Sequence, residues 1–526
     1  MHVKTLARKL PLSLSPFQVY GVLAEKGQLK HTALLETAEA GTHEHQRSVV
    51  MVSAALQVKA LNNCVTLTAL NLNGEELLKA ITDSETINEQ FMVRRESTNV
   101  ELSLAKSEAV NDESQRLSQA TTVSVLQYLR DLLKTDSSSD NESSLLVGAF
   151  SYELVEQYEE LPEVNKSQED YCFYVADQLV IQHKESQSAK VVVKGFGENA
   201  ENTVRLGVEL ESIYDVLVSQ TSSQLLSFDD SPAASTFDLS VSDNDYYQFV
   251  DKAKERILKG DIFQVVLART FNVSCSNAYK AYGKLRLTNP SPYMYFINFG
   301  DKELFGASPE SALKVNKQRE VYLYPIAGTR KRAIDDTTGE INHDQDSRIE
   351  FELVEDQKES AEHMMLVDLA RNDLAKVVVP GSREVIQLKR IVKYSHVQHM
   401  VSEVKGILKP EIDSLIAYRA CANMGTLTGA PKIKAMEIIR EQENHGRGYY
   451  GGAVCVLNAN DEFDSAIIIR SAVVIDGMAK ITAGAGIVYD SEPHLEALET
   501  VNKAKAVIDA CRNSTPEYSS PSELLS

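Results

Sequence analysis

The sequence of 526 residues has no tryptophan, few aromatic residues and only six cysteines. The cysteines are scattered and form no Cys-x-x-Cys pair, which argues against a disulfide framework and predicts reduced thiols in the cytoplasm. No apolar run reaches the roughly 18 residues that a membrane-spanning helix needs. Pro11 and Pro16 interrupt the N-terminal stretch, so we expect no signal peptide there.

Basic residues are also in short supply. The 54 lysines and arginines are outnumbered by 75 aspartates and glutamates, which gives a formal net charge of −21. A surface of this charge repels polyanions, so nucleic acids and anionic membranes are unfavourable partners. An anionic small-molecule substrate would therefore require local positive charge or a bound metal ion.

The pattern of apolar residues indicates an α+β protein. Strand-like and helical segments are interspersed, and they predict a layered α/β arrangement with large, mostly antiparallel sheets. The segment 220–240 is rich in serine, aspartate and alanine and has no apolar periodicity, so it is the best domain boundary. The predicted division is an N-terminal domain at 1–220, a linker at 221–240, a catalytic domain at 241–515 and a tail at 516–526.

Two segments more than a hundred positions apart each carry a pair of glutamates at helical spacing. Glu496 and Glu499 follow Pro493, which suits the first turn of a helix. Glu359 and Glu362 repeat the i, i+3 spacing. If the two helix faces converge, they offer the hard oxygen ligands that Mg²⁺ prefers. Taken singly, such a pair is more commonly a solvated helix face.

The surroundings of both pairs favour a site. Glu355 extends the helical spacing of Glu359 and Glu362, and Lys503 shares a face with the second pair. The apolar run 472–481 predicts one buried strand. After it, Gly484-Ala485-Gly486 predicts a backbone nest that an anion can approach closely.

Three short motifs place polar groups beside predicted strands. Gly328 and Thr329, in PIAGTR, offer a backbone N–H and a hydroxyl to an anion, although an ordinary turn is the commoner interpretation. Glu310, in GASPES, would have a raised pKa suited to a general acid, unless it begins a helix capped by Ser308. His399 lies in a half-buried strand pattern, where a core residue is commoner than a catalyst.

Three further segments carry groups that bind anions. The stretch MGTLTGAPK contains Thr426 and brings Pro431 to the start of a predicted helix, whose N-terminus attracts anions. The stretch RGYYGGAV, with Tyr450, is a loop that enters a strand. Arg470 follows an apolar run, where it either pairs locally or binds a carboxylate with two hydrogen bonds. None of these signals is specific alone, whereas their number and order are.

Together these segments resemble the chorismate-utilising enzyme family. The motifs that carry the resemblance, in chain order, are DIFQVV, NPSPYMYF, GASPES, PIAGTR, EHMMLVDLARNDL, VQHMVSEV, MGTLTGAPK, RGYYGGAV, IIIRSA, AGAG and EALETVNKA. They cover 242–510 densely and the N-terminal part more loosely. The resemblance implies a layered α/β chorismate-binding fold that holds chorismate and Mg²⁺ in a cleft of the sheet.

The resemblance also implies roles for the candidate residues. The implied metal ligands are Glu362 and Glu499, assisted by Glu359 and Glu496. The implied substrate-binding residues are Gly328, Thr329, Tyr450, Arg470, Gly484, Ala485, Gly486 and Lys503. By the same resemblance, Glu310 protonates the departing C4 hydroxyl and His399 supports the later elimination of pyruvate. Thr426 and Gln264 line the reaction site.

Two positions separate the branches of this family. Members that add water to chorismate carry a lysine base where Gln264 stands, and a neutral amide cannot activate water in that way. Aminodeoxychorismate synthases carry a lysine nucleophile where Ala327 stands. The resemblance therefore implies a magnesium-dependent lyase that converts chorismate and ammonia to anthranilate and pyruvate, the first committed step of tryptophan biosynthesis. An aminodeoxychorismate synthase and a catalytically inactive tryptophan-sensing scaffold are the alternatives.

The N-terminal part resembles a feedback module that binds L-tryptophan. The implied inhibitor-binding residues are Glu36 and Thr37 of LLET, with Pro292, Tyr293 and Met294. Thr37 stands where the family usually has serine, so a hydroxyl is kept and a methyl is added. No cysteine lies in a Gly-x-Cys-x-Gly nucleophile turn. The resemblance therefore implies a separate glutamine amidotransferase subunit that delivers ammonia within an α₂β₂ heterotetramer.

Overall fold

The computed structural model describes residues 1–11, 14–37, 47–96, 98–105, 116–117, 119–166, 168–183, 186–219, 237–335, 340–394 and 397–512. The strands are β1 Val3–Leu10, β2 Thr32–Glu36, β3 Arg47–Leu61, β4 Cys64–Ala69, β5 Phe91–Arg95, β6 Asn99–Leu104, β7 Leu145–Phe150, β8 Tyr171–His183, β9 Ser188–Phe196, β10 Asp238–Leu239, β11 Gln264–Ser274, β12 Tyr293–Asn298, β13 Glu303–Ser308, β14 Ser311–Val315, β15 Glu320–Leu323, β16 Ile326–Lys331, β17 Glu384–Lys393, β18 Val397–Ile407, β19 Gly429–Ala430, β20 Ala453–Asn458, β21 Phe463–Ile467, β22 Ser471–Ile475 and β23 Met478–Ile487. The helices are α1 Pro16–Leu23, α2 Leu72–Thr82, α3 Glu85–Gln90, α5 Ser124–Leu132, α6 Ser138–Glu142, α7 Thr203–Ser219, α8 Asp243–Leu258, α9 Ala278–Thr288, α10 His343–Glu355, α11 Gln357–Val377, α12 Ser414–Cys421, α13 Lys432–Glu443 and α14 Pro493–Arg512, with 3₁₀ turns at Glu25–Gly27, Tyr152–Gln157 and Gly197–Glu201.

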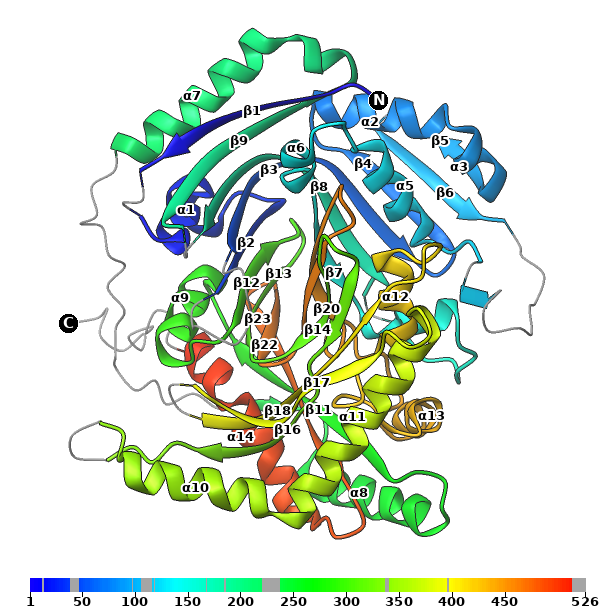
Figure 1. Cartoon of the computed structure of the whole chain (residues 1–526), viewed down its shortest axis with the longest axis vertical. Helices are drawn as coiled ribbons and strands as arrows, with labels where there is room; N and C mark the ends of the chain where they lie inside the picture. Colours follow the sequence, from blue (N-terminus) through cyan, green and yellow to red (C-terminus); the bar gives the residue numbers. More distant parts are fainter. Residues whose placement is uncertain are drawn as a thin grey trace, which may run out of the picture.

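Two long strands, β3 and β8, pair with each other, and a series of further paired strands extends from each of them. One series of strands continues from β3 through β2, β12, β13, β22 and β23 to β11. A second series continues from β8 through β7, β20, β21, β14 and β15 to β18, which also pairs with β16 and β17. All these pairings are antiparallel, so the predicted α+β fold with large antiparallel sheets is confirmed. In Figure 1 the two series lie side by side below the N-terminal strands.

Strands of the two series are apolar on both faces because both faces are buried in the interior. Every residue of β7 (LLVGAF) is buried, because one face meets the apolar cluster that includes Ile297, Leu304 and Val454 and the other meets a second cluster. Gly148 allows the close approach of β8, since a Cβ there would lie 2.2 Å from the carbonyl oxygen of Cys172. Burial on both faces thus produces the continuous apolar runs seen in the sequence.

The N-terminal and C-terminal parts of the chain share these sheets. Strand β2 pairs with β12, with Leu35 opposite Tyr295, and β7 pairs with β20, with Gly148 opposite Cys455. The predicted domain division remains a prediction. Most of the predicted linker (221–236 of 221–240) and the whole predicted tail lie outside the described residues.

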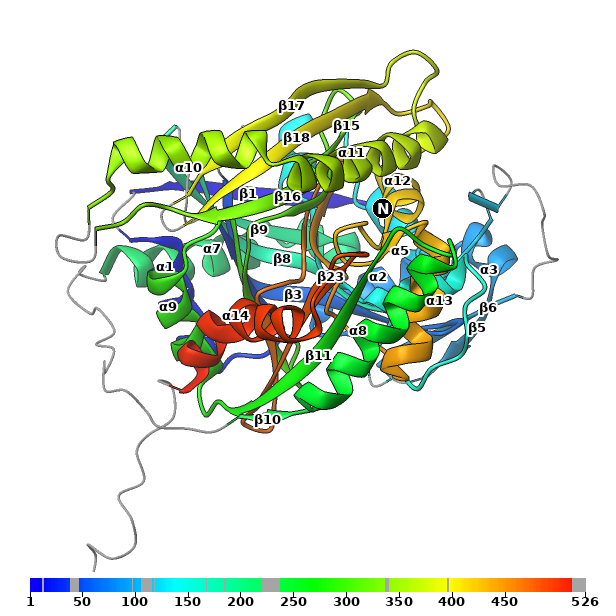
Figure 2. The same ribbon diagram turned by 90° about the horizontal axis from the view of Figure 1, so that it is seen from below.

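Three helices frame the lower half of the molecule. Helices α8 and α14 pack on β11 and β23 through an apolar cluster that includes Tyr246, Ala485 and Ala497. Helix α11 lies against β16 and β18, and Figure 2 shows it on the opposite side of the lower half from α14. Helix α14 begins at Pro493 as predicted. Helix α10 ends at Glu355 and Asp356 caps α11, so the prediction that Glu355 continues the face of Glu359 and Glu362 is wrong.

The strand predicted at 472–481 is in fact a hairpin. Strands β22 and β23 are joined at Asp476 and Gly477, which have φ values of 49° and 76°. Such an Asp-Gly pair is typical of a tight β-turn, so the chain turns here although the apolar run predicts one continuous strand. Residues 484–486 accordingly lie inside β23, paired with β11, and do not form the predicted backbone nest.

A buried charge cluster joins α5 to the C-terminal part of the chain. The Arg130 guanidinium lies 2.9 Å from the carboxylate of Asp413 and 2.6 Å from that of Asp461. We expect Arg130→Ala to lower the free energy of unfolding by about 3 kcal/mol, because two partly buried carboxylates lose their cation. Denaturant unfolding measures this. The exposed Arg94→Ala should change stability by less than about 0.5 kcal/mol, and equal effects of the two variants would contradict the prediction.

Candidate functional site

Glu310 is a buried carboxylic acid at the junction of β13 and β14. The residue is 7 % exposed, and the Thr426 hydroxyl donates to its Oε1 at 3.0 Å. Burial raises the pKa of Glu310 to about 8, against smaller lowering effects of Thr426 and Lys503. The backbone passes from strand to strand here, so the alternative of a helix capped by Ser308 is excluded. Glu310 is therefore mainly protonated at neutral pH and can donate a proton.

The PIAGTR motif forms strand β16 itself, with an irregularity in its pairing to β18 between Ala327 and Thr329. Gly328 has a φ of +74° at this point, and a Cβ there would lie 3.1 Å from Oε2 of Glu359. The Thr329 hydroxyl lies 2.8 Å from Nδ1 of His399 on β18. Burial, with a smaller contribution from Arg470, lowers the pKa of His399 to about 4, so its imidazole is neutral.

Arg470 and Lys503 bring positive charge to the same region. Arg470 donates to the carbonyl oxygen of Lys503 at 2.9 Å, and the Lys503 ammonium donates to the carbonyl oxygen of Gly484 at 2.9 Å. The ammonium also lies 2.6 Å from the Glu499 carboxylate. Burial lowers the pKa of Arg470 from its usual value, which Tyr450 and Glu499 partly oppose. This partly buried cation suits a carboxylate ligand.

Two glycines of β23 leave room for side chains of the site. A Cβ on Gly484 would lie 2.9 Å from the Tyr450 hydroxyl, and one on Gly486 would lie 2.8 Å from the Gln264 amide nitrogen. The intervening Ala485 is buried in the cluster against α8 and α14, away from these two side chains. Gln264 is buried, and its Oε1 has no hydrogen-bond partner among the residues that the structure describes. The geometry thus gathers Gln264, Tyr450, Gly484 and Gly486 but directs Ala485 elsewhere.

The four predicted metal ligands come from two facing helices. Burial raises the pKa of Glu362, and the charges of Glu359, Glu496 and Glu499 raise it further, which places α11 and α14 within electrostatic reach. Glu496 likewise has a raised pKa, from burial and from Glu499. The carboxylates of the two helices are therefore close enough to repel one another, and their role as metal ligands stays a prediction.

The carboxylates do not lie in a metal-coordination arrangement. Among the described parts of the chain, no three acidic, histidine or cysteine side chains form a group that could hold a metal ion. Glu499 pairs with Lys503, and Glu359 pairs with Arg330 at 2.7 Å. The four glutamates fit Mg²⁺ because carboxylate oxygens are the ligands it prefers and because they repel one another without a cation. To bind Mg²⁺, Glu499 and Glu359 would have to break their ion pairs with Lys503 and Arg330.

A cavity of about 970 Å³ lies where β2, β12 and β20 meet. It is lined by Thr37, Tyr293 and Met294, and β2 pairs with β12 so that Glu36 stands opposite Met294. The two halves of the predicted inhibitor element are thus adjacent, and the volume suffices for an amino acid. The Glu36 carboxylate accepts hydrogen bonds from Tyr282 and Arg286 of α9. Pro292 is buried directly before β12 and does not line the cavity.

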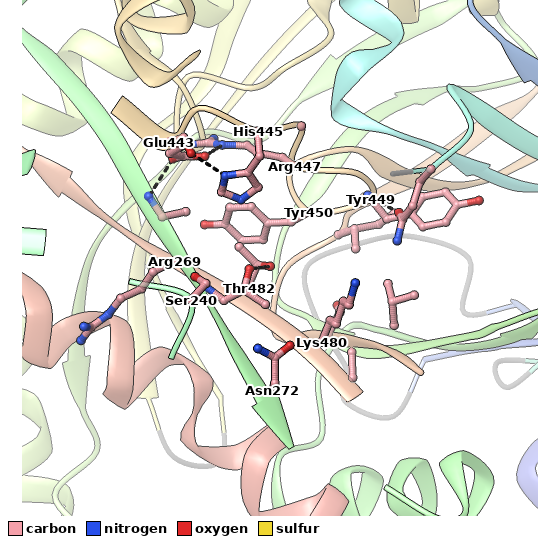
Figure 3. Close-up of a pocket in the computed structure, with 18 of the residues that line it drawn as sticks. Ser240, Arg269, Asn272, Glu443, His445, Arg447, Tyr449, Tyr450, Lys480 and Thr482 are labelled. Carbon is pink, nitrogen blue, oxygen red and sulfur yellow. Dashed lines mark hydrogen bonds and ion pairs between the residues drawn. The ribbon is translucent and has the colours of Figure 1, made fainter. Parts of the chain in front are cut away.

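Several residues of these cavities have no signal in the sequence. Arg47 of β3 and Asp464 of β21 line the large cavity, and no motif in the sequence singles either of them out. A second cavity of about 260 Å³ adjoins Tyr450. Figure 3 shows Glu443, Arg447 and Tyr450 together on one side of it. Arg447 belongs to the RGYYGGAV motif, but the motif does not indicate its ion pair with Glu443, which only the structure shows.

A model of the chorismate binding enzyme family matches residues 82–509. The chain belongs to this family. Curated relatives named anthranilate synthase component 1 are 40% identical. The one from Buchnera aphidicola subsp. Acyrthosiphon pisum matches over 97% of this chain and 97% of its own length. The one from Escherichia coli (strain K12) matches over 92% of each.

Solved structures give the same assignment of the fold. Anthranilate synthase component I from Streptococcus pneumoniae TIGR4 superposes with a TM-score of 0.69 at 28% identity, covering 89% of this chain and 93% of that one. The menaquinone-specific isochorismate synthase of Escherichia coli superposes with a TM-score of 0.67 at 16% identity, over 97% of this chain and 95% of that one, and shows the fold alone. Within the described residues, no helix has the length and apolarity to span a membrane.

Proposed function

We propose that this member of the chorismate-binding family is the large subunit of a cytoplasmic anthranilate synthase. It converts chorismate and ammonia to anthranilate and pyruvate. The observation that carries the proposal is the 40% identity to anthranilate synthase component 1 over 97% of the chain. Gln264 and Ala327 support it, since neither side chain can serve as the lysine base or nucleophile of the other branches.

Chorismate carries two carboxylates, and the site offers separate groups for them. Arg470, with the hydroxyls of Tyr450 and Thr329, suits one carboxylate. Glu362 and Glu499, assisted by Glu359 and Glu496, would hold Mg²⁺, which supplies electrostatic stabilisation to the other carboxylate when bound. Gly484 and Gly486 let the side chains of Tyr450 and Gln264 lie close against β23, beside the proposed substrate site.

The first chemical step replaces the C4 hydroxyl by an amino group at C2. Protonated Glu310 donates its proton to the hydroxyl, which leaves as water while ammonia attacks C2. In the second step the enolpyruvyl group leaves as pyruvate and the ring becomes aromatic. Neutral His399, held by Thr329, is suited to move the proton of this elimination.

Ammonia comes from a partner. The six cysteines lack a glutaminase nucleophile turn, which supports a separate glutamine amidotransferase subunit in an α₂β₂ assembly. Purified chain with chorismate, Mg²⁺ and ammonium at alkaline pH should therefore produce anthranilate fluorescence without the partner. A folded chain that leaves chorismate unchanged would support an inactive scaffold, and a non-fluorescent amino product would support aminodeoxychorismate synthesis.

L-Tryptophan is the proposed feedback inhibitor, and the large cavity is its proposed site. Arg47 and Asp464 offer opposite charges to the carboxylate and ammonium groups of an amino acid, and Thr37 offers a hydroxyl. Glu36 fixes β2 to α9 through Arg286, at 2.8 Å, and so supports the cavity wall.

Thr37→Ala should weaken inhibition by tryptophan about tenfold while leaving the uninhibited rate unchanged, because a lost hydrogen bond costs about 1 kcal/mol or more. The measurement is the tryptophan concentration that halves the ammonia-dependent rate. Thr288→Ala, on the exposed face of α9, is the matched control. Inhibition that is equal in the two variants would remove Thr37 from the inhibitor site.

A further inference from the structure

Arg447 and Glu443 form a fully buried ion pair beside the candidate site. Their side chains are each 2 % exposed, and the guanidinium meets the carboxylate through two hydrogen bonds. Both residues also bind backbone atoms. Arg447 donates to the carbonyl oxygens of Leu427 at 2.7 Å and Val266 at 2.8 Å, and Glu443 accepts from the amide of Ala268 at 2.9 Å.

Each of these backbone contacts adjoins a proposed site residue. Leu427 follows Thr426, which donates to Glu310. Val266 and Ala268 lie in β11 opposite Gly486 and Gly484. The pairing of β11 with β19 already holds the Thr426 segment beside β11, and the ion pair adds side-chain hydrogen bonds that join both to the loop that carries Arg447.

The same arginine contacts the substrate-binding tyrosine. Its guanidinium carbon lies 5.6 Å from the centre of the Tyr450 ring and 4.8 Å from that of Tyr152. Glu153 completes the arrangement from the N-terminal part, because its carboxylate accepts from the backbone amides of Arg447 at 2.7 Å and Gly448 at 2.9 Å. The loop that carries Tyr450 is thus held at both its backbone and its ring.

We propose that Arg447 and Glu443 are positioning residues, which hold Tyr450, the Thr426 loop and β11 in the geometry that the reaction requires. Stability alone gives little reason for such a pair, because apolar residues of similar size often replace a buried ion pair without loss. Small displacements of groups around a reacting substrate, by contrast, lower rates by about a hundredfold. The proposal rests on the proposed function of the site.

The test compares activity with stability in variants that leave no lone buried charge. Arg447→Met/Glu443→Met should unfold within a few degrees of the wild type yet lose about a hundredfold in kcat for anthranilate formation, with the KM for chorismate also raised. The control Arg440→Met/Glu156→Met removes a second arginine pair of α13, partly exposed at Glu156, in which Arg440 hydrogen-bonds the carbonyl oxygen of Pro162 and no proposed substrate-binding residue, and it should change neither constant.

A second variant tests whether Arg447 positions the site or only neutralises the charge of Glu443. Arg447→Lys keeps the positive charge but cannot reach the carboxylate and both carbonyl oxygens at once. It should fold and still lose most of the activity. A lysine variant or a double methionine variant with full activity would overturn the positioning role. Wild type that forms no anthranilate would instead contradict the proposed function.

Discussion

Replacing Glu310 by glutamine should lower kcat by about 10²- to 10⁴-fold, the usual contribution of a general acid. The amide has the same shape and can still accept the hydrogen bond of Thr426, so the site keeps its form and loses only the proton. Steady-state kinetics at saturating ammonium and chorismate measure the effect. Glu303→Gln is the matched control, because Glu303 is a partly buried carboxyl at the start of β13, the strand that leads to Glu310, and burial also raises its pKa.

The pH dependence gives an independent check on Glu310. Its pKa lies at about 8 in the folded chain against an ordinary value of 4.5. The wild-type kcat should therefore fall as pH rises through about 8, when the acid loses its proton. Between the two values the native state binds the extra proton, so stability should fall as pH rises across this window. In Glu310→Gln this component of the stability profile should disappear, and an unchanged profile would contradict the assignment.

Glu499→Gln should abolish measurable turnover, because the proposed metal site loses one of its two principal carboxylates. Calorimetric titration with Mg²⁺ alone should show weaker binding than in the wild type, which separates a metal ligand from a residue needed only for chemistry. The variant also frees Lys503 from its 2.6 Å ion pair, so chorismate binding without metal should be retained.

Asp509→Asn provides the comparison for Glu499. Asp509 lies on the same helix, is half-exposed and pairs only loosely with Arg512, at 3.8 Å. Its variant should bind Mg²⁺ and turn over like the wild type. If Glu499→Gln binds Mg²⁺ as tightly as Asp509→Asn does, Glu499 is not a ligand.

Local patterns predicted the elements that position the site. Pro493 and the i, i+3 spacing of the glutamates predict α14, and α11 and α14 bring the two acidic pairs within electrostatic reach although the helices pack on strands of different series. The hairpin at Asp476 escaped prediction, since the apolar run around it satisfies a buried strand equally well. The nest predicted at Gly484 and Gly486 is wrong for a related reason. Glycine in a strand marks a close approach by a side chain, and the partners, Tyr450 and Gln264, are distant in sequence.

The burial and the side-chain partners of the site residues depend on tertiary packing, which the sequence does not predict. Glu310 was identified from its motif, but its raised pKa depends on burial that only the folded chain provides. Glu36 was expected to bind the inhibitor, whereas its carboxylate is engaged by Arg286 and Tyr282. Arg447 and Glu443 are four positions apart, yet their contacts reach β11 and the Thr426 loop, which no local pattern specifies.

The sharing of strands between the two ends of the chain bears on how the protein is made. During synthesis, β2 and β7 emerge long before β12 and β20, so their hydrogen-bonding edges stay open while some hundreds of residues are added. Open edges of this kind invite pairing with other nascent chains, and such long-range closure is slow. Separately expressed halves should therefore aggregate, and productive folding should await completion of nearly the whole polypeptide.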